Sequence, residues 1–174
     1  MKMKLMAALV VLGAGFGAQA TTTALGAATV GAPLSFGGFS AQGTFNDIFT
    51  FTLPVNGGSG YSVTNFTFLP GLYNTVLATA SLVSNADTVL FNLDDTVLST
   101  TVTPGGNSLA LTWGPTAGGS YYLNVTGIAN GAAGGIYNGA ISVVAVPVPE
   151  PETFVMMLAG LGALAFLARR RHRD

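Results

Sequence analysis

The distribution of charge is the feature of this sequence that most limits how it can fold. All the lysine and arginine residues lie near the two ends, namely Lys2, Lys4, Arg169, Arg170, Arg171 and Arg173. Between Thr21 and Val148 there is no lysine, arginine, histidine or cysteine. The acidic residues of this central part are Asp47, Asp87, Asp94 and Asp95. Without disulfides or internal pairs of Asp with Lys or Arg, the central part must depend on its apolar core and its backbone hydrogen bonds.

This shortage of reactive side chains excludes several classes of protein for the central part. Nucleic-acid binding requires Lys or Arg to neutralise phosphates. Ser-His-Asp and Cys-His catalysis, Schiff-base lysines, Cys/His zinc sites and a phosphate-binding loop each need a side chain that this part lacks. Carboxylate chemistry, calcium binding through oxygen ligands, or no chemistry at all remain. We therefore expect a non-enzymatic protein with no cofactor and no nucleic-acid partner.

The first 20 residues have the three parts of a secretory signal peptide. Lys2 and Lys4 form the basic region, residues 5–17 are apolar, and Ala18-Gln19-Ala20 is a small-residue cleavage motif. An apolar run of about 13 residues is too short to span a bilayer core of ~30 Å as a stable anchor. The sequence therefore predicts export, with signal peptidase cutting the chain after Ala20.

The last part of the chain has the pattern of a linker followed by a membrane anchor. Three prolines between residues 147 and 152 favour an extended linker. Residues 153–168 are uncharged and mostly apolar. A helix of that length covers roughly 24 Å, and snorkelling arginines can make up the difference from the ~30 Å core. Arginines after a membrane helix stay on the cytoplasmic side. We therefore predict a transmembrane helix with a basic tail over residues 153–174.

The order of these C-terminal features resembles a known sorting signal. Pro149-Glu150-Pro151, an apolar helix and the arginines at 169–171 and 173 are similar to the PEP-CTERM signal of exported proteins in Gram-negative bacteria that make extracellular polysaccharide. The resemblance implies an inner-membrane intermediate and processing near the motif by exosortase, an integral-membrane enzyme. It also implies delivery to the cell surface or to the exopolysaccharide matrix of a biofilm. A plain C-terminal anchor that is never cleaved is the alternative.

Residues 21–146 have the pattern of an all-β domain. Short runs of β-branched and aromatic residues are separated by glycine and proline, as in sheet proteins. Strands are expected over residues 44–53, 61–69, 75–83, 88–93, 96–102, 108–113, 121–128 and 136–146, with Asp94-Asp95 as a turn before residue 96. This spacing predicts an antiparallel β-sandwich, either jelly-roll-like or immunoglobulin-like.

One expected strand places a carboxylate among aromatic side chains. Within residues 44–53, alternation puts Phe45, Asp47 and Phe49 on the same face of the strand. If this face points inward, Asp47 needs hydrogen-bond donors or a cation, because burying an unpaired carboxylate is too costly. We expect a structural carboxylate at this position, and a calcium ligand is the alternative.

Two further resemblances lie in the same domain. The residues Phe45, Asp47 and Phe49 match the pattern F-x-D-x-F, so the chain resembles the FxDxF subfamily of PEP-CTERM proteins. Residues 118–127, GGSYYLNVTG, resemble the late strands of small bacterial pre-peptidase-type β-sandwiches. The second resemblance concerns the fold and implies little about function.

Two weaker hypotheses concern ligand binding. Asp87, Asp94 and Asp95 offer oxygens for Ca²⁺, which takes six to eight such ligands, although adjacent acids are also common turn residues. Trp113, Tyr121 and Tyr122 are either core residues or an aromatic platform for sugar rings. A carbohydrate- or calcium-binding module is therefore the second hypothesis for the function. The first is an exported surface or matrix protein whose partners are signal peptidase, exosortase, the inner membrane and extracellular polysaccharide.

Overall fold

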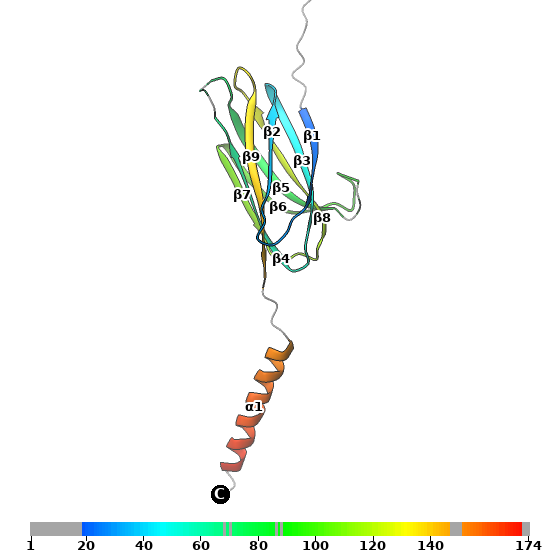
Figure 1. Ribbon diagram of the computed structural model, residues 1–174, viewed down its shortest axis with the longest axis vertical. Coiled ribbons are helices and arrows are strands. Elements are labelled where there is room, and N and C mark those ends of the chain that lie inside the picture. The colour runs from blue at the N-terminus through cyan, green and yellow to red at the C-terminus, as the bar shows by residue number, and fades with distance from the viewer. Residues whose placement is uncertain are drawn as a thin grey trace, which may run out of the picture. The chain divides into compact units, whose positions relative to one another are not determined.

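The computed structural model describes residues 19–67, 69, 71–85, 87, 89–146 and 151–171, which form two units divided between Val144 and Ala145. Among the described residues there are nine strands and one helix (Figure 1). In chain order they are β1 (Gln19–Ala27), β2 (Leu34–Ser40), β3 (Gly43–Leu53), β4 (Gly57–Asn65), β5 (Thr75–Asn85), β6 (Thr96–Gly106), β7 (Ser108–Trp113), β8 (Gly119–Ala129), β9 (Gly135–Ala145) and α1 (Pro151–Arg171).

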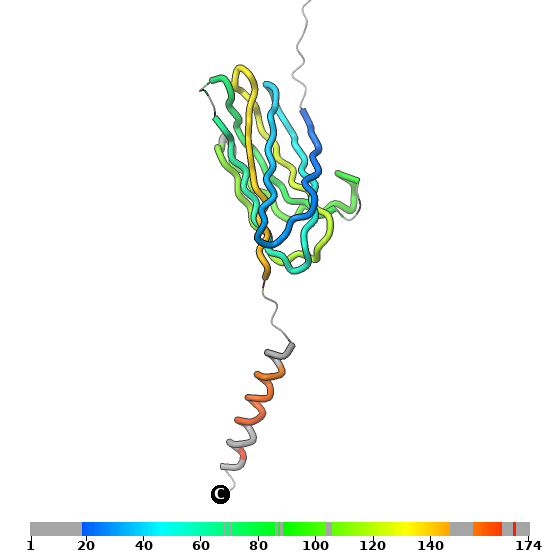
Figure 2. The backbone as a smooth tube through the Cα atoms, viewed as in Figure 1, coloured from blue at the N-terminus to red at the C-terminus, as the bar shows by residue number. Residues whose placement is uncertain are grey.

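The strands form two sheets. The order of the five-stranded sheet is β1-β3-β8-β5-β6, and that of the four-stranded sheet is β2-β9-β4-β7. The chain crosses between the sheets several times, as its trace shows (Figure 2). The pairs β3–β8, β5–β8, β5–β6, β4–β7 and β2–β9 are antiparallel, whereas β1 pairs with β3 in parallel. The sequence predicted antiparallel pairing only, so the parallel edge strand β1 corrects that expectation.

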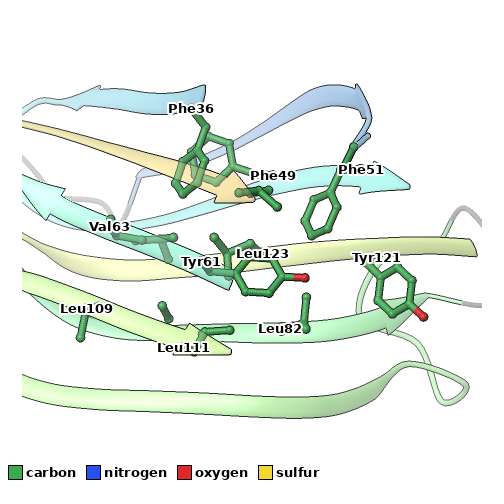
Figure 3. Close-up of a cluster of buried hydrophobic side chains, with 14 of the residues drawn as sticks. Phe36, Phe49, Phe51, Tyr61, Val63, Leu82, Leu109, Leu111, Tyr121 and Leu123 are labelled. Carbon is green, nitrogen blue, oxygen red and sulfur yellow. The ribbon is translucent and has the colours of Figure 1, made fainter. Parts of the chain in front are cut away.

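A shared hydrophobic core joins the two sheets (Figure 3). Phe49 and Leu123 come from the five-stranded sheet, while Val63, Leu111 and Ile141 come from the four-stranded sheet. Packing of this kind, with the inner faces of two sheets in contact, is the arrangement of a β-sandwich. The all-β prediction is therefore confirmed. The choice between a jelly-roll-like and an immunoglobulin-like sandwich stays a prediction.

The expected strands agree with the structure in most places. The strand expected at 108–113 coincides with β7, and Asp94-Asp95 lies in the turn region before β6. The strand expected at 61–69 is shifted, because Gly57 and Gly58 belong to β4 rather than to a turn. At Gly57 a Cβ atom would lie 3.0 Å from the Val143 side chain, so this glycine allows a close approach of the core.

The strand expected at 88–93 is wrong. The described residues between 89 and 95 form turns instead. Phe91 has a φ of 60°, in the left-handed region, and the Asp87 carboxylate accepts the Val89 amide hydrogen at 2.7 Å. Because an Asp side chain that binds the backbone two residues later initiates a turn, the chain bends here rather than extending.

The C-terminal unit contains helix α1, which begins at Pro151. The sequence predicted an extended linker through residue 152, but proline fits the first turn of a helix because its missing N–H would be unpaired there. The described side chains from Val155 to Leu164 are exposed. No helix within the described residues has the length and hydropathy required of a membrane span. The predicted transmembrane helix stays a prediction.

Candidate functional site around Asp47

Asp47 lies in β3 with only 3% of its surface exposed. Its Oδ1 atom accepts hydrogen bonds from the Thr21 backbone nitrogen at 3.2 Å and from the Thr21 hydroxyl at 2.5 Å. Its Oδ2 atom accepts a hydrogen bond from the Tyr137 hydroxyl. Thr21 belongs to β1 and Tyr137 to β9, in the other sheet. The carboxylate therefore connects β1, β3 and β9.

Aromatic rings enclose the Tyr137 partner of this carboxylate. Phe45 stacks on the Tyr137 ring, with centroids 5.2 Å apart and an interplanar angle of 10°. Phe49 meets the same ring edge-on at 6.4 Å, and Phe36 packs against Phe49 at 4.5 Å. Stacked and edge-to-face geometries are the favourable ones for aromatic pairs. The three motif residues Phe45, Asp47 and Phe49 thus hold one tyrosine by two rings and one hydrogen bond.

Gly38 in β2 makes room for the contact between Asp47 and Tyr137. A Cβ atom at this position would lie 2.9 Å from the Tyr137 hydroxyl oxygen and 3.1 Å from Asp47 Oδ2. Both distances are shorter than an ordinary contact with a methyl carbon. The backbone of β2 can therefore cover the hydrogen bond only because residue 38 has no side chain.

The protonation of Tyr137 is fixed by its surroundings. Burial raises the pKa of the Tyr137 hydroxyl far above its ordinary value of 10.0, and the hydrogen bond to Asp47 and the charge of Asp47 raise it further. Tyr137 is therefore a neutral donor across the physiological pH range. All three contacts of Asp47 are donors, so the carboxylate is held by hydrogen bonds at both oxygens.

The weaker calcium candidates lie in the loop between β5 and β6. Asp87 accepts hydrogen bonds from the Val89 amide and from the Asn92 side chain, at 2.7 and 3.1 Å. Asp95 Oδ2 accepts the Asn92 amide at 3.1 Å and the Tyr122 hydroxyl at 3.2 Å. Asp94 is exposed. In the part of the chain that the structure describes, no three acidic, histidine or cysteine side chains lie close enough together to hold a metal.

Two oxygen atoms of this loop are buried without a hydrogen-bond partner, namely Asp95 Oδ1 and Asn92 Oδ1. The same loop covers a small second core on the outer face of the five-stranded sheet, made of Ile48, Val83 and Tyr122. Burial, then the nearby charge of Asp95 and the hydrogen bond to it, raise the pKa of Tyr122 to about 12. The loop therefore covers this second core and is held by hydrogen bonds, while Asp95 Oδ1 and Asn92 Oδ1 accept none.

The aromatic platform proposed from the sequence does not form. Tyr121 and Tyr122 are neighbours on β8, so their side chains point to opposite faces of the sheet. Tyr121 stacks on Phe51 in the main core at 6.4 Å, and Tyr122 contacts Phe91 in the covering loop at 5.4 Å. Trp113 packs at the border of the main core. The three rings serve the two cores rather than one exposed surface.

A surface hollow of about 500 Å³ lies beside β1 and β3. Its polar lining residues are Thr22, Thr50, Thr52, Asn85 and Asp87. The other lining residues are Ala24, Gly26, Ala27, Phe51, Leu90, Ser120 and Tyr121. Mixed apolar and hydrogen-bonding walls of this kind are typical of small-molecule sites.

The residues predicted for sorting fall largely at the edges of the described chain. Ala18, Pro149, Glu150 and Arg173 lie outside the described residues. Ala20 is the second residue of β1, and its neighbour Gln19 accepts the Ala41 amide hydrogen at 3.1 Å. Pro151 begins α1, Arg169 is exposed, and Arg170 and Arg171 are the last two residues of the helix.

The sequence interpretation missed Thr21 and Tyr137, the two partners of Asp47. Tyr137 could have been assigned to the core, since Tyr137, Ile141 and Val143 alternate onto one face of the expected last strand. Its pairing with Asp47 had no signal, because 90 positions separate the two residues. Thr21 lies in a strand of exposed residues without alternation, so no pattern marked it.

Comparison with known families identifies the C-terminal segment. Residues 147–171 match the family model described as the PEP-CTERM protein-sorting motif. The chain is therefore an all-β domain followed by an exosortase sorting signal. That signal implies export and membrane-anchored sorting by exosortase. Membership of the FxDxF subfamily stays a prediction.

Comparisons over the rest of the chain add little. No curated protein matches the sequence significantly. Among solved structures, the chain is similar to the pre-peptidase C-terminal domain of collagenase from Bacillus anthracis, with 18% identity, 70% of this chain and 93% of that chain covered, and a TM-score of 0.34. A likeness of this strength supports no inference about function.

Proposed function

We propose that this chain is the precursor of a non-enzymatic cell-surface or extracellular-matrix protein of a Gram-negative bacterium, sorted by exosortase. The observation that carries the proposal is the PEP-CTERM match at residues 147–171. The signal-peptide pattern of residues 1–20 supports it, because sorting of this kind requires prior export.

The proposed pathway has three steps. Signal peptidase cuts after Ala20 once the chain has entered the export machinery. Helix α1 then holds the chain in the inner membrane, with its arginines on the cytoplasmic side. Exosortase finally processes the chain near residues 149–151, which separates the β-domain from the helix. The mature protein is the β-domain.

The surface chemistry of the β-domain supports a destination among polysaccharides. Its charged side chains are four aspartates, and Asp47 is buried. Threonines such as Thr22, Thr52 and Thr112 are exposed. A sparsely charged surface with many hydroxyl-bearing residues exchanges hydrogen bonds with sugar hydroxyls.

Deleting exosortase from the producing bacterium tests the sorting proposal. Without the enzyme, full-length protein should accumulate in the membrane fraction, and the released form should be lost. Measuring the intact mass of the protein in both fractions shows at which residues the chain begins and ends. In wild-type cells, replacing residues 149–151 by alanine should give the same accumulation, whereas the exposed control Asp94→Asn should be processed normally. Equal release with and without exosortase would refute the proposal.

The hollow beside β1 and β3 favours a second candidate function, the binding of polysaccharide. Its lining includes Thr, Asn and Asp residues, whose side chains can donate to or accept from sugar hydroxyls. Changing Thr22 and Thr52 together to alanine should weaken binding to the bacterium's own exopolysaccharide at least about fivefold, because two hydrogen bonds are lost.

The control for this experiment is Thr112→Ala, since Thr112 is exposed on β7 in the other sheet. Co-sedimentation with purified exopolysaccharide measures the affinity of each variant. Binding that disappears with a chelator would instead implicate calcium and the unpaired oxygens of Asp95 and Asn92. No binding by the wild-type domain would eliminate this second function.

A further inference from the structure

Asp47 is a buried carboxylate whose partners carry no charge. The groups that donate to it are one backbone amide and two hydroxyls, from Thr21 and Tyr137. The sequence offers it no cationic side chain, because residues 21–148 contain no lysine, arginine or histidine. Neutral donors satisfy the hydrogen-bonding capacity of a buried carboxylate, but only a cationic donor also compensates its charge.

One of the two residues that donate to Asp47 is also the residue at which the predicted export cleavage falls. The Thr21 nitrogen lies 3.2 Å from Asp47 Oδ1, and this nitrogen belongs to the Ala20–Thr21 peptide bond. Hydrolysis breaks that C–N bond, and the oxygen of the water joins the Ala20 carbonyl carbon to give a carboxylate. The Thr21 nitrogen takes up protons and becomes an α-ammonium group, with a pKa of about 7.7–8.0 in an unfolded chain.

We propose that cleavage after Ala20 supplies the counter-ion of Asp47: the new α-ammonium group of Thr21 forms an ion pair with the buried carboxylate and locks β1 onto β3. The proposal rests on the cleavage position in the proposed function. Its consequence is that the mature protein is more stable than its precursor, through a group that exists only after processing.

The surroundings of Thr21 suit an ammonium group. Thr21 is exposed, so the ammonium keeps part of its hydration while it contacts Asp47. A charge that stays in contact with water avoids most of the desolvation that makes fully buried ion pairs expensive. The Thr21 hydroxyl, at 2.5 Å from Oδ1, remains in place as a second donor from the same residue.

Cleavage also removes contacts, and these are weaker. Gln19 accepts hydrogen bonds from the Ala41 amide at 3.1 Å and from the Ser40 hydroxyl at 3.5 Å. Gln19 and Ala20 also pair with Phe45 and Asn46 at the beginning of β1. Both residues are exposed, so water can replace the lost hydrogen bonds. The stability gained from the ion pair at the buried Asp47 carboxylate therefore exceeds the stability lost with the hydrogen bonds of Gln19 and Ala20.

The geometry also sets an order of events. Gln19 and Ala20 are paired with β3 in the folded chain, whereas a protease needs its substrate extended and free of other pairing. Strand β1 is at the edge of its sheet and pairs only with β3, so it can be absent while the rest of the sandwich forms. Cleavage therefore precedes the docking of β1, and the new ammonium group then fixes the strand.

The chain permits a selective test. The segment from Thr21 to Asp174 contains no lysine, so the α-amino group is its only amine. Acetylation of the unfolded chain restores a neutral amide at Thr21, as in the precursor, and hydroxylamine then removes any ester formed on hydroxyl groups. The refolded free and acetylated chains, both in mild detergent, differ in one charge beside Asp47.

The free chain should melt at a temperature about 2–4 °C or more above that of the acetylated chain at pH 7, as measured by circular dichroism. In the variant Asp47→Asn the two forms should melt together, whereas the exposed control Asp94→Asn should keep the full difference. Equal melting of the free and acetylated wild-type chains would overturn the proposal.

The pKa of the Thr21 amino group provides a second readout that does not depend on a variant that folds. Reductive methylation with ¹³C-formaldehyde keeps the charge and labels this amine alone. The titratable groups at this position are the Asp47 carboxyl and, behind it, the Tyr137 hydroxyl. From β2, the uncharged residue Gly38 lies beside Asp47, and the uncharged residue Ser40 contacts Gln19. The carboxylate should raise the pKa of this amine above its ordinary value of about 7.7–8.0.

The sign of the pH dependence follows from this rise. Because the pKa is higher in the folded state, the extra stability of the free chain is complete below about pH 7.7 and is lost as the pH rises through the folded value. The melting difference should therefore shrink by pH 10. If the ¹³C-methyl signal of the folded chain gave the same pKa as that of the chain unfolded in urea, the ion pair would be contradicted. N-terminal sequencing of the native protein separately tests cleavage after Ala20, so failure of the ion pair and failure of the predicted processing give different results.

Discussion

Among single residues, Gly38 is the one whose missing side chain leaves room for the hydrogen bond between Asp47 and Tyr137. The variant Gly38→Ala places a methyl group 2.9 Å from the Tyr137 oxygen and 3.0 Å from its ring. Either the tyrosine or strand β2 must move, and overpacking of this kind lowers the free energy of unfolding by about 1–3 kcal/mol. Urea denaturation followed by circular dichroism measures the loss.

Gly60→Ala is the matched control for that prediction. Gly60 also lies inside a strand, β4, and is also half-buried, but its Cβ would meet only the Ser142 hydroxyl at an ordinary 3.6 Å. Alanine should be neutral or stabilise the chain by up to about 1 kcal/mol there, because it lowers the entropy of the unfolded state. Equal destabilisation by both variants would mean that Gly38 is not required for the contact.

The sequence predicted half of the Asp47 site. Alternation placed Phe45, Asp47 and Phe49 on one face of the strand, and elementary electrostatics required partners for the carboxylate if that face is buried, as the structure shows. The identities of Thr21 and Tyr137 depend on how β1 and β9 are brought against β3. That is a property of the tertiary arrangement, which the spacing of residues along one strand does not encode.

At the scale of elements, predictability followed the strength of the local pattern. Strand β7 alternates buried and exposed residues and is bounded by turn residues, and its predicted limits were correct. Strand β1 is almost wholly exposed, so it carries no alternation to detect. It is held by its ladder with β3 and by the contact of Thr21 with Asp47, both of which come from distant parts of the chain.

The sequence analysis missed strand β2 and wrongly predicted a strand in the loop after β5, for two different reasons. The sequence of β2 contains Gly37-Gly38, a pair that normally marks a turn, but both glycines here allow β2 to lie close to β9. The loop contains enough apolar residues to look like a strand, yet these residues cover Tyr122 from outside the sheet. Its apolar residues follow from tertiary packing rather than from strand formation.

At the scale of the whole molecule, tyrosine dominates the alkaline titration of the β-domain. The domain has no lysine or cysteine, so few other groups titrate above pH 9. Burial is the largest cause that raises the pKa of Tyr61 to about 12 and that of Tyr122 to about 12, and it raises the pKa of Tyr137 still further. In an unfolded chain these hydroxyls ionise near pH 10.

This difference predicts unfolding at high pH with a defined sign. Between about pH 10 and 12 the unfolded chain has lost protons that the folded chain retains, so the free energy of unfolding falls as the pH rises. Each buried tyrosine contributes a slope of up to about 1.4 kcal/mol per pH unit. We expect the tyrosinate absorbance of Tyr61, Tyr122 and Tyr137 to appear together with the loss of the β-sheet circular dichroism signal.

The variant Tyr122→Phe measures the share of one residue in this transition. Phenylalanine cannot ionise, so the slope of unfolding free energy against pH should fall by up to about 1.4 kcal/mol per unit, while unfolding at pH 7 reports the separate loss of the hydrogen bond to Asp95. The experiment uses chains acetylated at Thr21, because their amino group no longer titrates. The tyrosines are then the groups that titrate between about pH 10 and 12. The contrary result would be ionisation of Tyr61, Tyr122 and Tyr137 near pH 10 while the sheets stay intact. Hydroxide would then reach these hydroxyls without unfolding, and the description of closed cores around the three tyrosines would be wrong.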